Sequence, residues 1–107
     1  MADKVVAFKM KLNPGQAAEY KKRHDGIWPE LKKELRDAGV YDYNIFLDEE
    51  TNILFAVQKV KEGHDGDSQK NVTPTTQKWW DMMADIMEVN PDNSPVSIEL
   101  KQMFHFD

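Results

Sequence analysis

Residues 41–60, YDYNIFLDEETNILFAVQKV, decide the fold. In the first eight, Tyr41 and Tyr43 fall at alternate positions with the aliphatic residues that follow, as in a strand with one buried face. Residues 53–60 are rich in the β-branched and aromatic types that strands favour. The polar stretch 48–52 between them is typical of a turn. The segment therefore predicts an antiparallel hairpin in which the two tyrosines share one face.

The chain before this hairpin predicts one strand and one helical region. Residues 5–12 alternate between apolar and polar types, which indicates a half-buried strand. Residues 16–38 carry apolar side chains at helical spacing, and Gly39 is a reasonable helix stop. Gly26 and Pro29 interrupt this spacing. Because proline is tolerated in the first turn of a helix, Pro29 either opens a second helix or kinks a continuous one.

The chain after the hairpin predicts a loop, a helix and a last strand. Residues 61–76 are polar and read as a loop, and a helix is expected from about 75 to 88. After a turn-rich loop, residues 98–106 alternate as a strand. The order strand–helix–strand–strand–helix–strand is that of the ferredoxin-like α+β fold, with helices on one face of an antiparallel sheet.

The size and surface of this fold predict a single domain that forms a homodimer. At 107 residues, the chain from 1 to 107 has no room for a second core. The face of the sheet without helices would still carry apolar side chains on every strand. Two sheets stacked face to face would bury those side chains.

Composition excludes several classes of function. The formal charge of −5, from 14 basic and 19 acidic residues, argues against nucleic acid or an anionic membrane surface as a partner. The absence of cysteine excludes disulfides, thiolate metal sites and a cysteine nucleophile. The N-terminal residues lack the apolar region of a signal peptide, and no apolar run reaches membrane-spanning length. We therefore expect a cytoplasmic protein.

His24 is the first candidate for chemistry. It lies one helical turn after Tyr20, so both side chains can project from the same face of a helix. A histidine changes protonation near neutral pH and can donate or accept a proton at little cost. The alternative is a surface or core histidine that only makes a hydrogen bond. No pair of histidines has metal-ligand spacing, so we expect no metal site.

Aromatic residues and a polar loop give further candidates. Trp79 and Trp80 point about 100° apart on a helix, so one should pack inward while the other lines a cavity or an interface. The alternative is that both are anchors of the core and of a dimer. The hydroxyl of Tyr43 needs a partner if it is buried, and the alternative for this residue is simple packing in the sheet. The loop 90–95, NPDNSP, can fix its own backbone or offer groups that bind hydroxyls. Such combinations of rings and polar groups suit a sugar site.

Two segments, HDGIWPEL at 24–31 and NPDNSPV at 90–96, together resemble the L-rhamnose mutarotase family. The likeness runs from Phe8 to Phe104 and departs mainly in the polar stretch 63–76. It implies a dimeric ferredoxin-like α+β barrel that needs no cofactor. It also implies a proton donor at His24 and sugar contacts from the remaining matched positions, which are Tyr20, Tyr43, Trp79 and Trp80.

The reaction implied is interconversion of the α and β anomers of L-rhamnose by acid–base-assisted ring opening. The exact sugar stays open among deoxy-sugars that differ only in hydroxyl stereochemistry. The base that partners His24 also stays open, with Asp92, Glu30 or a water as candidates. Two other functions remain as alternatives. One is a cofactor-free or haem-dependent monooxygenase of the dimeric α+β barrel type, and the other is a non-catalytic sugar-binding module.

Overall fold

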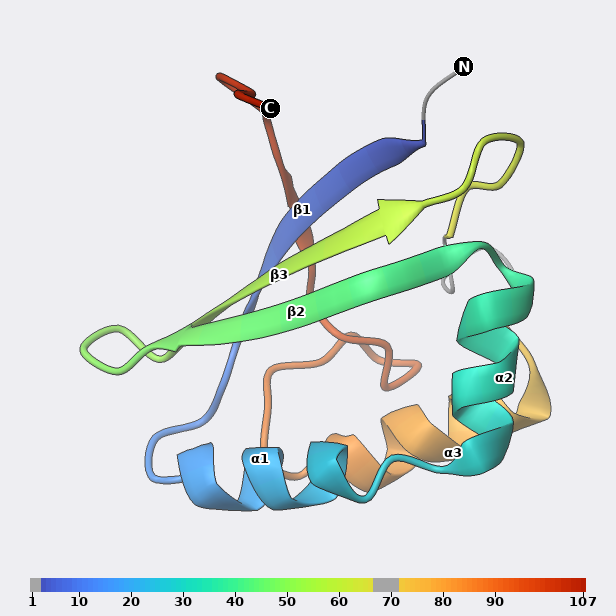
Figure 1. Cartoon of the computed structure of the whole chain (residues 1–107). Coiled ribbons are helices and arrows are strands. Elements are labelled where there is room, and N and C mark those ends of the chain that lie inside the picture. Colours follow the sequence, from blue (N-terminus) through green and yellow to red (C-terminus); the bar gives the residue numbers. More distant parts are fainter. Residues whose placement is uncertain (1–2, 67–71) are drawn as a thin grey trace.

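The computed structural model describes residues 3–66 and 72–107. Within them the chain forms four strands and three helices (Figure 1). Their order matches the predicted strand–helix–strand–strand–helix–strand pattern, with the first helical region split in two. The elements are β1 (Lys4–Lys11), α1 (Ala17–Asp25), α2 (Pro29–Asp37), β2 (Val40–Asp48), β3 (Ile53–Val60), α3 (Pro74–Met83) and β4 (Ile98–Leu100).

The strands form one antiparallel sheet in the order β2-β3-β1-β4, so the hairpin partner β3 lies beside β1. One row across the sheet runs from Ile45 through Ala56 to Phe8. This strand order is that of the ferredoxin-like fold, and the α+β prediction is confirmed. Within the described ranges, no helix is both long and apolar enough to cross a membrane.

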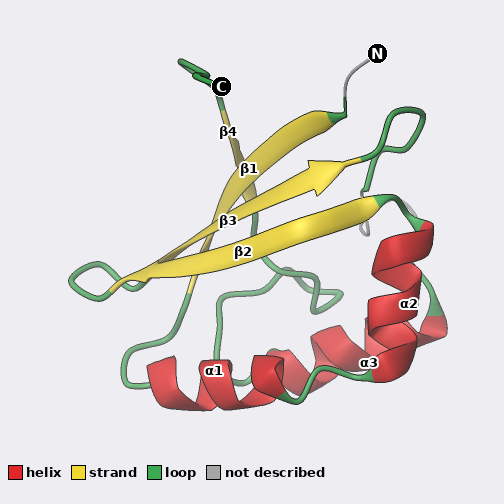
Figure 2. Cartoon of the chain, in the orientation of Figure 1, coloured by secondary structure: helices red, strands yellow, loops and turns green. Residues whose placement is uncertain are grey.

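All three helices lie on the same face of the sheet, as Figure 2 shows. The hydrophobic core fills the space between the helices and the sheet. It draws on alternate residues of the strands and on the inward faces of the helices, as the two periodicities require. Its buried members are Met10, Leu12, Tyr20, Leu31, Leu54, Ala56, Trp79, Trp80, Met83, Ile86 and Met87.

The break predicted between residues 26 and 29 separates two helices. Helix α1 ends at Asp25, and the Gly26 N–H bonds back to the Lys22 carbonyl. Pro29 opens α2 after Trp28, whose backbone is extended with φ −67° and ψ 139°. Of the two alternatives for Pro29, the second helix is therefore the one observed. Proline suits this first position because its N–H would have no helical partner there.

A bulge in β2 corrects the prediction that Tyr41 and Tyr43 share a face. Tyr41 pairs with Lys59 and Asn44 with Val57, so two residues of β2 oppose a single residue of β3 between those pairs. Asp42 takes a left-handed backbone conformation with φ 47°, which accommodates the extra residue. Tyr41 therefore lies on the face away from the helices, where its hydroxyl donates to Asp3 at 2.6 Å.

The second predicted helix is shorter than expected. Helix α3 begins at Pro74, after Thr73 caps it by accepting from the Thr76 N–H, and ends at Met83. The following segment bonds to the end of β1 instead, through Asn13 N–H to the Ile86 carbonyl. Ile86 and Met87 are buried. The apolar spacing that predicted a longer helix therefore belongs in part to a buried segment that is not helical.

The last predicted strand is also shorter, since β4 covers only Ile98–Leu100. Leu100 pairs with Ala7 of β1, and residues 101–107 continue away from the sheet without regular structure (Figure 1). Of the predicted loop 61–76, residues 61–66 have no helix or strand, and residues 67–71 lie outside the described residues.

Candidate active site

Tyr20 and His24 form the centre of the candidate site on α1. Their rings are stacked, with centroids 4.2 Å apart and planes at 24°. The prediction that they share one helical face is confirmed, since residues four apart lie one turn from each other. Tyr20 is buried at 8% exposure, and the His24 ring is half-buried.

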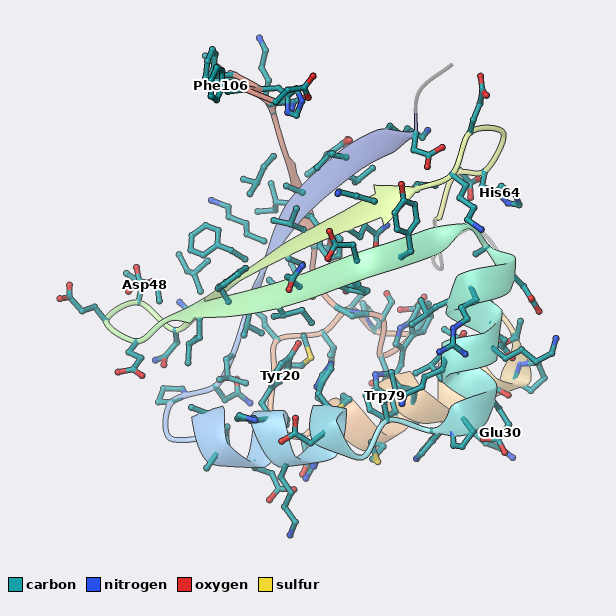
Figure 3. The ribbon with its side chains drawn as sticks, viewed as in Figure 1. Tyr20, Glu30, Asp48, His64, Trp79 and Phe106 are labelled. Carbon is teal, nitrogen blue, oxygen red and sulfur yellow. The ribbon has the colours of Figure 1, made fainter. Side chains whose placement is uncertain are left out.

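Trp79 joins this pair from α3. Its ring meets the His24 ring edge-on, with centroids 5.3 Å apart and planes at 88°. Trp28, from the turn between α1 and α2, meets Trp79 in the same way at 5.2 Å. Figure 3 shows Tyr20 and Trp79 directed from their helices toward the sheet. Two segments distant in sequence, residues 20–28 and α3, thus bring four rings together.

Tyr43 approaches the site from the sheet. Its ring meets the Phe8 ring edge-on, with centroids 6.4 Å apart. Phe8 packs against the core on the helix-facing side of the sheet. Burial raises the pKa of Tyr43 to about 12, although 37% of the residue is exposed. Burial also raises the pKa of Tyr20, and the neighbouring Tyr43 adds to this. Both hydroxyls are therefore protonated at neutral pH and available as donors.

Trp80 is at 5% exposure and belongs to the same buried core. Exposure does not separate it from Trp79, which is at 8%, so both indoles pack inward. The prediction that one of the two lines a cavity or an interface stays a prediction. The two tryptophans differ in their neighbours, because the Trp79 ring contacts the ring of His24.

The hydrogen bond of His24 fixes its tautomer. Nδ1 lies 3.1 Å from the Tyr20 carbonyl oxygen, which can only accept, so Nδ1 carries the proton. The other nitrogen, Nε2, then has a free lone pair in the neutral ring. Burial lowers the pKa of His24 below its usual value, against a smaller opposing effect of the bond to Tyr20. Neutral His24 therefore presents a proton acceptor at Nε2 near pH 7.

The side chains of the loop 90–95 fix its own backbone, which confirms the first of its two predicted roles. The second role, binding of ligand hydroxyls, stays a prediction. The Asp92 carboxylate accepts from the Ser94 N–H at 2.9 Å and from the Ser94 hydroxyl at 2.5 Å. These bonds lower the pKa of Asp92. Asn90 Nδ2 also donates to the Ser94 hydroxyl, and Gln77 of α3 donates to the Asp92 carbonyl. The loop is thereby held against α3.

The candidate bases differ in placement. Asp92 is already engaged by Ser94, as described above. Glu30 stands on the first turn of α2 and projects to the outer side of that helix, away from Tyr20 and Trp79 (Figure 3). Among the residues the structure describes, no three or more His, Cys, Asp or Glu side chains are grouped as metal ligands would be.

Two surface hollows lie away from the aromatic cluster, along β1 and β4. The larger, about 470 Å³, is lined by Val5, Val6, Ala7, Glu99, Leu100, Lys101 and Gln102. The smaller, about 190 Å³, is lined by Lys9, Met10, Lys11, Ile53, Glu88, Val96 and Ile98. Neither hollow contains a predicted site residue. The chemistry therefore points to the His24 cluster rather than to these hollows.

Sequence reasoning missed three residues that build the cluster. Trp28 and Phe8 contact Trp79 and Tyr43 through space, which no local spacing indicates. Arg23 joins α1 to the end of α3 through partners about 60 residues away, which its local sequence does not indicate. A usable signal existed for Trp28, because a tryptophan directly before a helix-opening proline is placed to fold back toward the helix it starts.

Comparison with known proteins agrees with the fold and identifies the family. A family model described as L-rhamnose mutarotase matches residues 5–106. The L-rhamnose mutarotase of Bacteroides thetaiotaomicron is 63% identical over 101 residues, covering 94% of this chain and 96% of the relative. That of Phocaeicola vulgatus is 62% identical over 101 residues, with the same coverage of each chain.

A solved structure gives the same result. The crystal structure of an L-rhamnose mutarotase from Formosa agariphila superposes with a TM-score of 0.88 at 56% sequence identity, covering 97% of this chain and 99% of that one. Sequence and fold therefore agree over nearly the whole length. The chain belongs to the L-rhamnose mutarotase family.

Proposed function

We propose that this protein interconverts the α and β anomers of L-rhamnose by acid–base-assisted ring opening. The observation that carries the proposal, beside the family, is the His24 ring held between Tyr20 and Trp79. A titratable ring is thereby fixed against two aromatic side chains that suit the apolar face of a sugar. The family match does not favour the monooxygenase alternative.

Ring opening requires two proton movements and one bond cleavage. The anomeric hydroxyl loses its proton, the bond from the anomeric carbon to the ring oxygen breaks, and the ring oxygen gains a proton. The free aldehyde rotates and closes again on its other face, with the same steps reversed. No electron is transferred, so the overall reaction needs only a proton donor and a proton acceptor. A well-placed acid–base group contributes about 10²–10⁴-fold to such a rate.

His24 is the group we assign to proton delivery. In the neutral tautomer fixed by Tyr20, Nε2 first accepts the proton of the anomeric hydroxyl. The resulting imidazolium then donates it to the ring oxygen, which is bonded to the same carbon. The low pKa of the half-buried ring favours this donation, since a weaker base gives up its proton more readily. One side chain can thus serve as base and then as acid, or share the first role with a water.

The remaining matched residues are assigned to sugar binding. Tyr20 and Tyr43 keep protonated hydroxyls that can donate to sugar oxygens. Trp79 offers an indole next to the proton-transfer group, on which the apolar face or the methyl group of the sugar can lie. Trp80 belongs to the same buried cluster and supports the Trp79 indole from the core.

We also propose a homodimer formed through the face of the sheet that the helices leave uncovered. Phe46 is 62% exposed and Ile98 55% exposed, and both lie in one row of that face with Phe55 and Lys9 between them. Beyond β4, three large apolar side chains are at least 80% exposed, namely Met103, Phe104 and Phe106. A second copy would cover both the face and this terminal segment.

Anomeric exchange measured by saturation-transfer NMR tests the activity. Catalytic amounts of protein should accelerate exchange between the two anomers of L-rhamnose, and do so more than for L-fucose or D-glucose. Binding of rhamnose with exchange left at the solvent rate would identify a sugar-binding module instead. Neither binding nor acceleration with any of these sugars would refute the proposed function.

A further inference from the structure

Arg23 is the most extensively bonded side chain next to the candidate site. Its Nε donates to Glu19 at 2.8 Å, one turn back on α1. Its Nη1 donates to the Met82 carbonyl at 2.7 Å and to Asp85 Oδ1 at 2.8 Å, and its Nη2 lies 3.4 Å from Asp85 Oδ2. The side chain is 19% exposed. Its guanidinium thus joins α1 to the last turn of α3 and to the residues just after it.

These bonds are well suited to holding the two helices at a fixed distance. Met82 lies in the final turn of α3, where carbonyl oxygens have no helical partner, and Arg23 supplies a charged donor there. The planar fork can satisfy a carbonyl and a carboxylate at once, which a lysine cannot do in the same geometry. The clamp is therefore directional as well as electrostatic.

The same two helices carry the rings of the site. His24 directly follows Arg23 on α1, and Trp79 lies one turn before Met82 on α3. The contact between the two rings, at 5.3 Å, crosses the boundary between the helices that the clamp connects. A change in the position of α1 relative to α3 would therefore move His24 Nε2 relative to the Trp79 indole.

We propose that Arg23 is a positioning residue, which fixes His24 against Trp79 by clamping α1 to the end of α3. The proposal rests on the proposed function for its effect on rate, but its effect on geometry stands independently. Because proton transfer requires close placement of the reacting atoms, a displaced ring lowers turnover more than it weakens sugar binding. Arg23 itself makes no contact with the reacting atoms in this assignment.

A matched control is available on the same helix. Lys21 forms an ion pair with Asp25 at 2.8 Å, also between a cation and a carboxylate on α1. That pair is confined to α1, and its side chains are 77% and 66% exposed. Exposed pairs of this kind contribute little to stability. Lys21→Met therefore removes one positive charge from α1 without opening the link to α3.

The test compares Arg23→Met, Arg23→Lys and Lys21→Met with the native protein. Anomeric exchange of L-rhamnose gives kcat and KM, and the proton chemical shifts of the His24 ring report its stacking on Tyr20 and Trp79. We expect Arg23→Met to lower kcat about tenfold with KM within twofold, and to move the His24 shifts toward those of an unstacked histidine. Lys21→Met should match the native protein in both readouts.

Arg23→Lys and one further variant, Asp85→Asn, separate geometry from charge and from folding. Arg23→Lys keeps the positive charge but loses the planar guanidinium. If Arg23 clamps the two helices, the kcat of this variant should lie between those of Arg23→Met and the native protein. Asp85→Asn keeps the native Arg23 and weakens only the carboxylate side of the clamp. It should shift the His24 ring signals in the same direction, by less. This variant provides the test if Arg23→Met does not fold.

The outcomes are distinguishable from failure of the proposed function. If the native protein does not accelerate exchange, the function fails, and the His24 ring shifts still decide whether the clamp exists. If the native protein is active, the clamp proposal is overturned by an Arg23→Met protein with native kcat and native ring shifts. Full activity of Arg23→Lys with reduced activity of Lys21→Met would also overturn it, because charge alone would then explain the effect.

Discussion

Replacement of His24 by asparagine separates proton transfer from structure at the candidate site. The asparagine amide nitrogen occupies nearly the position of the histidine Nδ1, so it can still donate to the Tyr20 carbonyl. It has no group at the position of Nε2 and does not titrate. The variant thus keeps the local hydrogen bond of α1 and removes the atom assigned to proton delivery.

The expected losses differ in size for activity and stability. Removal of one acid–base group should lower kcat by about 10²–10⁴-fold, which corresponds to about 3–5 kcal/mol in the activation barrier. The variant also loses the ring contacts of His24 with Tyr20 and Trp79. At about 0.5–1.5 kcal/mol for each aromatic pair, the free energy of unfolding should fall by about 1–3 kcal/mol. The protein should therefore remain folded at 25 °C.

The assay is anomeric exchange of L-rhamnose by saturation-transfer NMR, with urea unfolding measured on the same preparations. Lys22→Asn serves as the control, because Lys22 lies on the same helix turn with an exposed side chain. We expect native kcat for Lys22→Asn and a strong loss for His24→Asn. A folded His24→Asn protein that exchanges the anomers within threefold of the native rate would refute the assignment of proton delivery to His24.

Three further predictions address protonation, sugar contact and assembly. Because burial lowers the pKa of His24, this residue binds more protons in the unfolded than in the folded chain between its lowered pKa and about pH 6.5. The free energy of unfolding should rise with pH through that range in a urea titration series, and kcat/KM should fall as pH drops below the His24 pKa. Tyr43→Phe should raise KM about 2- to 10-fold through loss of one hydrogen bond, measured by the same exchange assay, whereas Tyr41→Phe on the opposite face should leave KM unchanged. Phe46→Glu should convert a dimer into a monomer in sedimentation equilibrium, and a native protein that sediments as a monomer would refute the proposed interface.

Local signals predicted most of the fold, and the errors arise where backbone pairing outweighs them. The helix break at Pro29 was predictable because proline restricts its own backbone. The end of α3 was not, because Ile86 continues the helical apolar spacing while its carbonyl bonds to Asn13, 73 residues earlier. The bulge at Asp42 also has no signal in the sequence pattern. Its positive φ leaves no mark on the alternation of apolar residues.

The candidate site was predictable only where it is local. Tyr20 and His24 are four residues apart, and helical geometry alone places them on one face. The contact of His24 with Trp79 joins two helices and depends on how α1 lies against α3. Arg23 contributes to that arrangement through Met82 and Asp85, partners that become visible only in three dimensions. The roles assigned to these residues in the reaction stay predictions.

The site is built partly from the hydrophobic core, which limits the mutations that can inform on function. Trp79 and Tyr20 are both members of the buried cluster and are at 8% exposure. Truncation of a buried tryptophan to alanine costs about 3–5 kcal/mol, a large part of the stability of a small domain. Loss of activity in Trp79→Ala would therefore not distinguish sugar contact from unfolding. His24 and Tyr43 are less buried and offer variants of nearly equal volume, so the chemistry of this site is best tested through them.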